Sequence, residues 1–178
     1  TRMTRLDMSA AELMPRIRTS SIFRYLSDGE CLDLVNKGIV TRYEAKERFI
    51  TEGEESPTFY VVVGGVVNIT VHERTGKEVF ICAIGEGDVI GEAAIFMNRP
   101  RTANAITAEP TILLEFTRDR LLGFLRNNPT AGLKILMIVI HSLLNKLRDA
   151  NQELAFERKA AYKQSEVDDL INSYFANQ

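Results

Sequence analysis

Hydrophobic positions change their spacing twice along the chain, which divides it into a helical, a β-rich and a second helical part. Near the start, Ser9–Glu12 and Ser27–Glu30 both have the Ser-x-x-Glu spacing of a capping box, which predicts a helix beginning at each. Pro15 weakens the prediction for the first helix beyond its first turns, because proline removes a helical hydrogen-bond donor. Gly38 is expected to stop the second helix.

From about Ile39 to Phe116 the pattern consists of short β-branched runs separated by glycines and polar turns. The runs predict strands over Phe59–Val63, Val66–Val71, Glu78–Ile84 and parts of Ile106–Phe116. Several short strands with frequent turns are typical of a sandwich, a barrel or a jelly roll.

A long helix is predicted from Asn128-Pro129 to beyond Leu154. Its apolar residues are spaced alternately by three and four, which is a heptad seam about three heptads long: Leu133, Leu136, Ile140, Leu143, Leu147, Ala150 and Leu154. Ile135, Val139 and Leu144 lie off this seam and can face the β-rich part. The alternative is one wide stripe buried against the parent domain.

The chain after Leu154 is polar, and a capped segment at Ser165–Asp168 predicts one more short helix. These patterns divide the chain into an N-terminal helical extension (1–20), a domain with its long C-terminal helix from about 129 (21–154), and a polar helical tail (155–178).

Composition narrows the classes of function. Apolar residues make up 45% of the chain, which is enough for a core, and the net charge of −2 gives no general basic surface for nucleic acid. The longest apolar run, Ile135–Ile140, is far shorter than the ~18 residues that span a bilayer, so no membrane partner is expected. Without an apolar signal segment near Thr1–Asp7, a cytoplasmic location is expected.

The residue pattern gives little indication of a catalytic site or a metal site. His72 and His141 lack ligand spacing, and Cys31 and Cys82 are isolated thiols best explained as small apolar residues. No catalytic residue, metal ligand or cofactor is therefore predicted, and the chain is not expected to be an enzyme.

The segment from Gly85 to Asn104 carries the most informative chemistry. It contains a Gly-rich turn, a short strand, Gly91, a short helix on small residues, and a loop that returns through Pro100 to Arg101. A helix N-terminus and the Arg101 guanidinium both bind anions, and the Glu92 carboxylate accepts a hydrogen bond from a hydroxyl, so together they suit a sugar phosphate. From these residues alone, a strand turn, a helix cap and a surface ion pair remain alternatives.

This segment closely resembles the phosphate-binding cassette of cyclic-nucleotide-binding domains. Gly91-Glu92, Ala94 and Pro100–Ala103 match the cassette pattern, including its nine-residue step from Glu to Arg. Further blocks agree with the family in order and spacing, so that the resemblance covers roughly residues 20–155: Gly53-Glu54, Phe59–Val62, Gly65–Val67 and Ile84–Asp88. The resemblance implies an α+β fold, an antiparallel, jelly-roll-like β-roll with N-terminal helices, a short cassette helix and a long C-terminal helix.

The resemblance also implies roles for individual residues. Arg101 would clamp the cyclic phosphate and Glu92 the ribose 2′-hydroxyl, with backbone groups of Gly91 and Ala94 near the ribose and phosphate. Ala93 and Ala103 complete this expected ligand-binding set. Thr102 stands where several cGMP-binding members carry Thr, which leans toward cGMP, although some cAMP-preferring channels have Thr there too.

The long helix contacts the purine in related dimeric regulators, which makes Arg148 and Asn151 candidates here. A solvated helix face is the alternative for both residues. The charged positions beside the apolar seam suggest that this helix pairs with its copy in a homodimer.

The function predicted from the sequence is that of a regulatory sensor domain that binds cAMP or cGMP and signals through its C-terminal helix. About two dozen residues follow Leu154, too few for the winged helix-turn-helix of the catabolite activators, so this chain itself is not expected to bind nucleic acid. Two alternatives remain: a dimerisation or partner-docking module that needs no ligand, and the sensor part of a transcription regulator.

Overall fold

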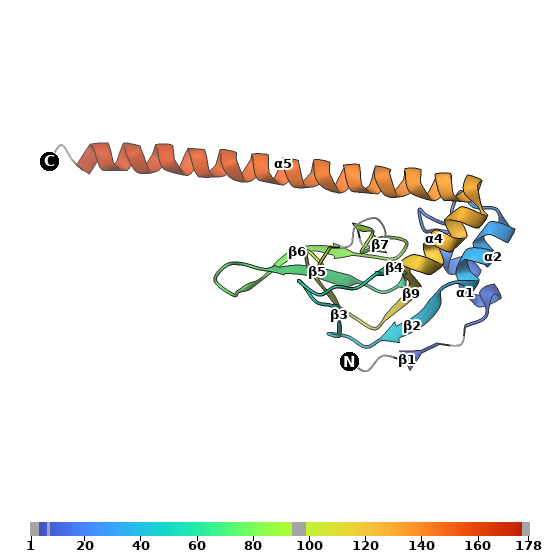
Figure 1. Cartoon of the computed structure of the whole chain (residues 1–178). Helices are drawn as coiled ribbons and strands as arrows, with labels where there is room; N and C mark the ends of the chain where they lie inside the picture. Colours follow the sequence, from blue (N-terminus) through green and yellow to red (C-terminus); the bar gives the residue numbers. More distant parts are fainter. Residues whose placement is uncertain (1–3, 7, 94–98, 176–178) are drawn as a thin grey trace. The chain divides into compact units, whose positions relative to one another are not determined.

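Two antiparallel sheets lie in the first part of the chain (Figure 1). The computed structural model describes the backbone of residues 4–6, 8–93 and 99–175, and the side chains of these residues apart from Ala10 and 157–175. The chain divides into two units, Thr1–Ile138 and Val139–Gln178, and both sheets belong to the first.

The larger sheet has five strands in the order β1-β2-β9-β4-β7. In that order they are Thr4–Arg5, Ile39–Tyr43, Thr111–Thr117, Thr58–Gly64 and Val89–Ile90. The smaller sheet has four strands in the order β3-β8-β5-β6. They are Arg48–Ile50, Asn104–Thr107, Val67–His72 and Glu78–Ile84. The antiparallel pairing and the accompanying helices confirm the predicted α+β fold class.

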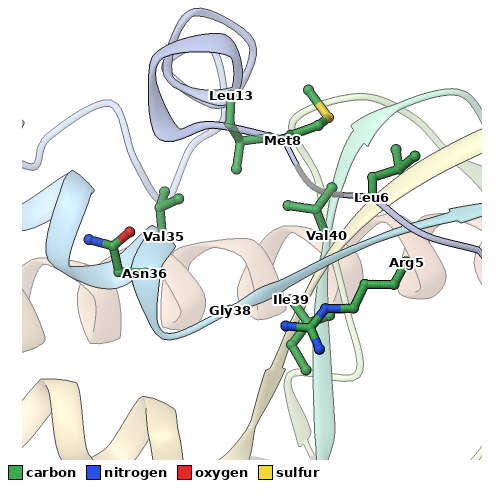
Figure 2. Close-up of a pocket in the computed structure, with 9 residues that line it drawn as sticks. All are labelled: Arg5, Leu6, Met8, Leu13, Val35, Asn36, Gly38, Ile39 and Val40. Carbon is green, nitrogen blue, oxygen red and sulfur yellow. The ribbon is translucent and has the colours of Figure 1, made fainter.

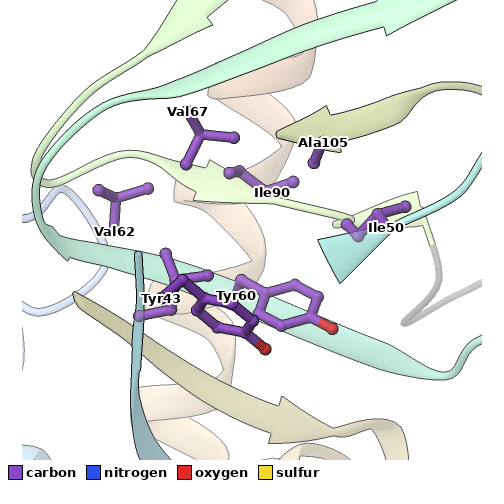
Figure 3. Packing of buried hydrophobic residues seen from close by; sticks show 8 residues of the cluster. Tyr43, Ile50, Tyr60, Val62, Val67, Ile90 and Ala105 are labelled. Carbon is purple, nitrogen blue, oxygen red and sulfur yellow. The ribbon is translucent and has the colours of Figure 1, made fainter. Parts of the chain in front are cut away.

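The core lies between the two sheets (Figure 3). The larger sheet contributes Tyr43, Tyr60, Val62, Ile90 and Leu113, and the smaller sheet contributes Ile50, Val67 and Ala105. The ring of Phe49 lies between those of Tyr43 and Tyr60, with centroid distances of 5.2 and 5.0 Å. This packing fixes Tyr60, and with it the start of β4.

Helices α1 (Ala10–Ile17) and α2 (Asp28–Asn36) begin at the predicted capping boxes. The Ser9 and Ser27 hydroxyls accept hydrogen bonds from the backbone N–H of Glu12 and Glu30, whose carboxylates bond back to the serine N–H groups. The weakening expected after Pro15 does not occur, since α1 continues through it to Ile17. Leu13 and Ile17 are fully buried, and this packing outweighs the missing donor.

Gly38 follows the C-cap of α2, Lys37, as predicted, but packing explains the glycine. A β-carbon at Gly38 would overlap the side chains of Leu114 and Phe116 on β9. The end of α2 therefore lies directly on the larger sheet.

Helix α4 (Arg118–Asn127) was absent from the sequence-based prediction. Its N-cap is Thr117, whose hydroxyl accepts a hydrogen bond from the Arg120 N–H at 3.5 Å. Leu121 and Phe124 are buried on one face at a spacing of three. The cap and this short apolar spacing were the available signals.

Helix α5 (Pro129–Phe175) begins at the predicted proline and continues for 47 residues. A separate short helix after Ser165 is therefore wrong, because the long helix runs through that segment. Ile135 and Val139 are buried, whereas Leu144, which was expected to face the β-rich part, is exposed. Most of the heptad seam is exposed: Leu133, Ile140, Leu143, Leu147, Ala150 and Leu154.

By length and composition alone, the segment Pro129–Phe156 of α5 could cross a membrane. Core helices of soluble proteins share this property, so the finding does not change the expectation drawn from the sequence, which stays a prediction.

Candidate functional site

Gly91 lies at the end of β7, where the strand leaves the larger sheet. The pairing of Tyr60 with Ile90 places it beside the start of β4. Its φ of +81° is a left-handed conformation that residues with a β-carbon rarely adopt. A β-carbon here would overlap the Arg101 guanidinium and lie 3.1 Å from the Thr58 carbonyl oxygen. Both the left-handed backbone conformation and the position of the Arg101 guanidinium therefore favour glycine at this position.

The backbone of Arg101 is fixed to the turn that follows β3. Its N–H donates to the Glu54 carbonyl at 2.9 Å, and its carbonyl accepts from the Gly53 N–H at 2.8 Å. Gly53 has a φ of +82°, so glycine suits the conformation of this turn. The Gly53-Glu54 block of the sequence thus serves to hold the arginine.

The turn and the Arg101 loop are tied together a second time by Asn104, the first residue of β8. Its side chain is fully buried, and its Oδ1 accepts hydrogen bonds from the Glu52 N–H at 2.9 Å and from Arg48 Nη1 at 3.4 Å. Its Nδ2 donates to Glu78 Oε1 at 3.3 Å. Asn104 therefore connects three segments beside the candidate site.

The Arg101 side chain is only 8% exposed. Its Nη2 donates to the carbonyl oxygen of Thr58 and, at 3.3 Å, to the hydroxyl of Ser56. Its Nε is buried and has no hydrogen-bond partner among the residues that the structure describes. One edge of the guanidinium is thus held by protein, while Nε has no partner among the described residues, an arrangement that is costly for a buried donor without a ligand.

Burial lowers the pKa of Arg101, and the nearby Tyr60, Glu54 and Glu92 act to raise it. Because the arginine side chain is not deprotonated in proteins, the guanidinium keeps its charge. Burial raises the pKa of the neighbouring Tyr60 to about 12. The Glu115 carboxylate adds to this rise, whereas the positive charge of Arg101 opposes it. The site therefore keeps a positive charge in largely dehydrated surroundings, where an anion binds most strongly.

Glu92 is also buried, at 7% exposed, directly after Gly91. It lies close enough to Arg101 to favour the charged guanidinium. A cationic donor and a carboxylate acceptor side by side form a receptor for a ligand that carries both an anionic group and a hydroxyl.

The remaining predicted residues differ in their surroundings. Ala103 is half-buried, whereas Thr102 and Ala93 are exposed. Ala94 lies outside the described residues. Arg148 and Asn151 belong to the second unit, where both side chains are exposed on α5. Their contact with a purine stays a prediction.

The sequence-based reasoning missed the residues that hold the guanidinium, Ser56 and Thr58. Thr58 acts through its backbone carbonyl, which any residue type supplies, so no sequence signal marks it. Ser56 lies between two matching blocks and Tyr60 lies within one, Phe59–Val62, but only the packing around Arg101 shows that both lie close to the guanidinium. Among the described residues, no group of histidine, cysteine and acidic side chains is arranged to hold a metal ion.

Comparison with known proteins gives consistent matches. The family model described as "cyclic nucleotide-binding domain" matches residues 40–128, half of this chain. A cGMP-dependent protein kinase of Plasmodium berghei is 35% identical over 91 residues, which cover 51% of this chain and 10% of the kinase. A CRP-like cAMP-activated global transcriptional regulator of Mycobacterium tuberculosis is 30% identical over 104 residues, 58% of this chain and 45% of the regulator.

A solved cyclic nucleotide-binding domain from Methylobacillus flagellatus has the same fold. Its TM-score is 0.75 at 22% identity, and the match covers 83% of this chain and 84% of that one. The chain spans less than half the length of these two curated relatives.

Proposed function

Because this chain belongs to the cyclic nucleotide-binding domain family, we propose that it is a sensor domain that binds cAMP or cGMP at Arg101 and Glu92. The observation that carries the proposal is the buried Arg101 guanidinium, whose Nε lacks a partner among the described residues. A cyclic phosphate would supply both the acceptor and the negative charge.

The cyclic phosphate is the part of the ligand that Arg101 recognises. Hydrogen bonds to Thr58 and Ser56 hold one edge of the guanidinium, so less side-chain freedom is lost when the ligand binds. Its buried position excludes water, which strengthens the attraction to a phosphate. The backbone bonds to Gly53 and Glu54 keep the loop in place.

The ribose is recognised by Glu92, the buried carboxylate next to the guanidinium. It accepts a hydrogen bond from the 2′-hydroxyl, which is free in a 3′,5′-cyclic nucleotide. Gly91 offers backbone without a side chain at the same point, and Ala93 and Ala103 are small enough to leave room around it. This pairing of groups suits a ribose phosphate better than inorganic phosphate.

The choice of purine rests on Thr102 and on the helix residues Arg148 and Asn151. Thr102 follows the phosphate-binding arginine and its exposed side chain can turn toward a ligand. If its hydroxyl forms a hydrogen bond with a guanine, the site favours cGMP. If the hydroxyl forms a hydrogen bond with the phosphate, which both ligands share, it favours neither. In this proposal Arg148 and Asn151 contact the purine from α5.

Signal output runs through α5. Ile140, Leu143, Leu147 and Leu154 are apolar and exposed, which favours a partner helix, and the simplest one is the same helix of a second copy. Coupling requires that the ligand binds one arrangement of this helix better than another. The proposed domain is regulatory, and catalysis is not part of its role.

Calorimetric titration of the chain with cAMP, cGMP and 5′-AMP tests the proposal. We expect saturable binding of at least one cyclic nucleotide and much weaker binding of 5′-AMP, whose dianionic phosphate has a different shape and position. Equal affinity for all three, or no heat with either cyclic nucleotide, would contradict it. The thermal unfolding temperature measured with and without each ligand gives an independent readout.

A further inference from the structure

A groove on the first unit lies among β1, the end of α2, the start of β2 and α4. Two neighbouring cavities of about 450 and 500 Å³ form it, and they share Arg5, Asn36 and Gly38. We call them together the α2–α4 groove. None of the residues proposed to bind the nucleotide lines either cavity.

The two ends of the α2–α4 groove differ in chemistry. Figure 2 shows the first end, where the side chains of Met8, Leu13 and Val40 lie around the cavity and Arg5 lies beside Ile39. The second end is lined by Lys37, Arg120 and Asn127. The first end therefore presents the half-buried apolar side chains of Leu6, Met8 and Ile39 together with polar groups, and the second end presents cations and an amide.

The charge of the groove is opposite to that of the chain. The whole chain has a net charge of −2, whereas the described lining of the groove includes three cations and no acidic residue. Lys37 pairs with Asp33 at 3.2 Å, but among the described side chains neither Arg5 nor Arg120 forms an ion pair. Arg120 Nη1 donates to the Lys37 carbonyl at 3.4 Å, which directs this side chain toward the end of α2.

Gly123 lines the basic end from inside α4. Glycine within a helix costs about 1 kcal/mol relative to alanine. Nothing lies within 4 Å of where its β-carbon would be, so packing does not require glycine. Its absent side chain leaves the backbone of α4 open to the groove.

We propose that the α2–α4 groove binds an extended acidic segment of a partner protein. An apolar side chain of the segment enters the first end, where the half-buried Leu6, Met8 and Ile39 are accessible, and its carboxylates face Arg5 and Arg120. Charge complementarity supports this occupant, since the uncompensated cations attract carboxylates and repel a basic partner. The size of the two cavities suits a few side chains of an extended segment.

Selection from a random twelve-residue peptide display library on the wild-type chain tests the proposal. We expect enriched peptides to carry several Asp or Glu residues and at least one large apolar residue. Their synthetic, fluorescein-labelled forms are then titrated by fluorescence anisotropy. Arg5→Glu/Arg120→Glu should weaken binding roughly tenfold or more, since it reverses two charges that face the ligand.

Two further variants separate the groove from general charge effects and from misfolding. Arg126→Glu changes an exposed arginine of α4 that does not line the groove, and should alter affinity less than about threefold. Gly123→Leu fills open space, so it should block the peptide while thermal unfolding shows an intact fold. Thermal unfolding serves as the fold control for every variant. Because no cyclic nucleotide is used in any of these measurements, the test is independent of nucleotide binding.

Three results would overturn the proposal. One is selection of peptides without acidic enrichment. Another is an equal loss of affinity in Arg126→Glu and in the double variant. The third is that a single-stranded oligonucleotide or pyrophosphate binds more tightly than the selected peptides and depends on Arg5 and Arg120 in the same way. That result would assign the groove to phosphate groups.

Discussion

The guanidinium of Arg101 occupies the space that a β-carbon at Gly91 would need. These residues lie ten positions apart, at the two ends of the segment that resembles the phosphate-binding cassette. The absence of a side chain at Gly91 lets the arginine approach the end of β7, where the proposed ligand site lies.

Gly91→Ala is expected to weaken cyclic-nucleotide binding roughly tenfold or more, because the new methyl group displaces the guanidinium. Gly76→Ala is a matched control, since Gly76 also has a φ of +81° but nothing within 4 Å. Both variants should lose about 1–2 kcal/mol of folding stability through backbone strain. Calorimetry and thermal unfolding measure the two effects, and equal affinity losses in both variants would contradict the contact's importance.

Arg101→Ala should nearly abolish nucleotide binding and leave the fold intact. Leaving a buried phosphate without its charged partner costs ~2–5 kcal/mol, or roughly 30- to several-thousand-fold in affinity. Arg99→Ala, which removes an exposed arginine from the same loop, should keep affinity within about threefold of wild type. A similarly small change in Arg101→Ala would show that the phosphate binds elsewhere.

Thr102→Ala is expected to weaken cGMP more than cAMP. One neutral hydrogen bond contributes ~0.5–1.5 kcal/mol, so selectivity should shift about two- to twelvefold. Thr102→Ser keeps the hydroxyl and should restore the wild-type preference. Competition titrations of both nucleotides against a fluorescent analogue give the ratio. Equal losses for the two ligands would assign the hydroxyl to the shared phosphate.

Replacing Leu143 and Leu147 with Glu should convert dimers into monomers, because both exposed leucines lie on the proposed helix seam. Nucleotide affinity should change as well if α5 transmits the signal. Gln152→Glu adds charge at another exposed position of α5 and should leave the dimer unaffected. Sedimentation with and without nucleotide measures the state, and a wild type that is monomeric in both conditions would refute the dimer.

Asn104→Ala should lower the free energy of unfolding by about 1–3 kcal/mol. The substitution removes the buried side chain that accepts a hydrogen bond from the Glu52 N–H and donates one to Glu78 Oε1. Asn68→Ala, at a half-buried position on the neighbouring β5, should cost less. Urea unfolding followed by circular dichroism gives both values. If Asn68→Ala is as costly as Asn104→Ala, the hydrogen bonds of Asn104 add little stability.

The sequence by itself determined the local features whose causes are local. Ser9 and Ser27 predicted helix starts because a capping box is completed within four residues. Strand β6, Glu78–Ile84, was predicted with its observed bounds from its β-branched and apolar content. The resemblance of Gly91, Glu92 and Arg101 to the phosphate-binding cassette of the family identified the candidate site, since a motif can be recognised without knowing its surroundings.

Only the tertiary structure decided which segments meet, because those contacts depend on backbone atoms far apart in sequence. Glu54 and Thr58 hold Arg101 through carbonyl oxygens, which every residue possesses, so no residue type reveals them. Packing of Leu13 and Ile17 carried α1 through Pro15, against the local preference. The residue types at the candidate site could be recognised in the sequence. The burial of Arg101, whose Nε has no described partner, arises only when segments that are distant in sequence exclude water from the side chain.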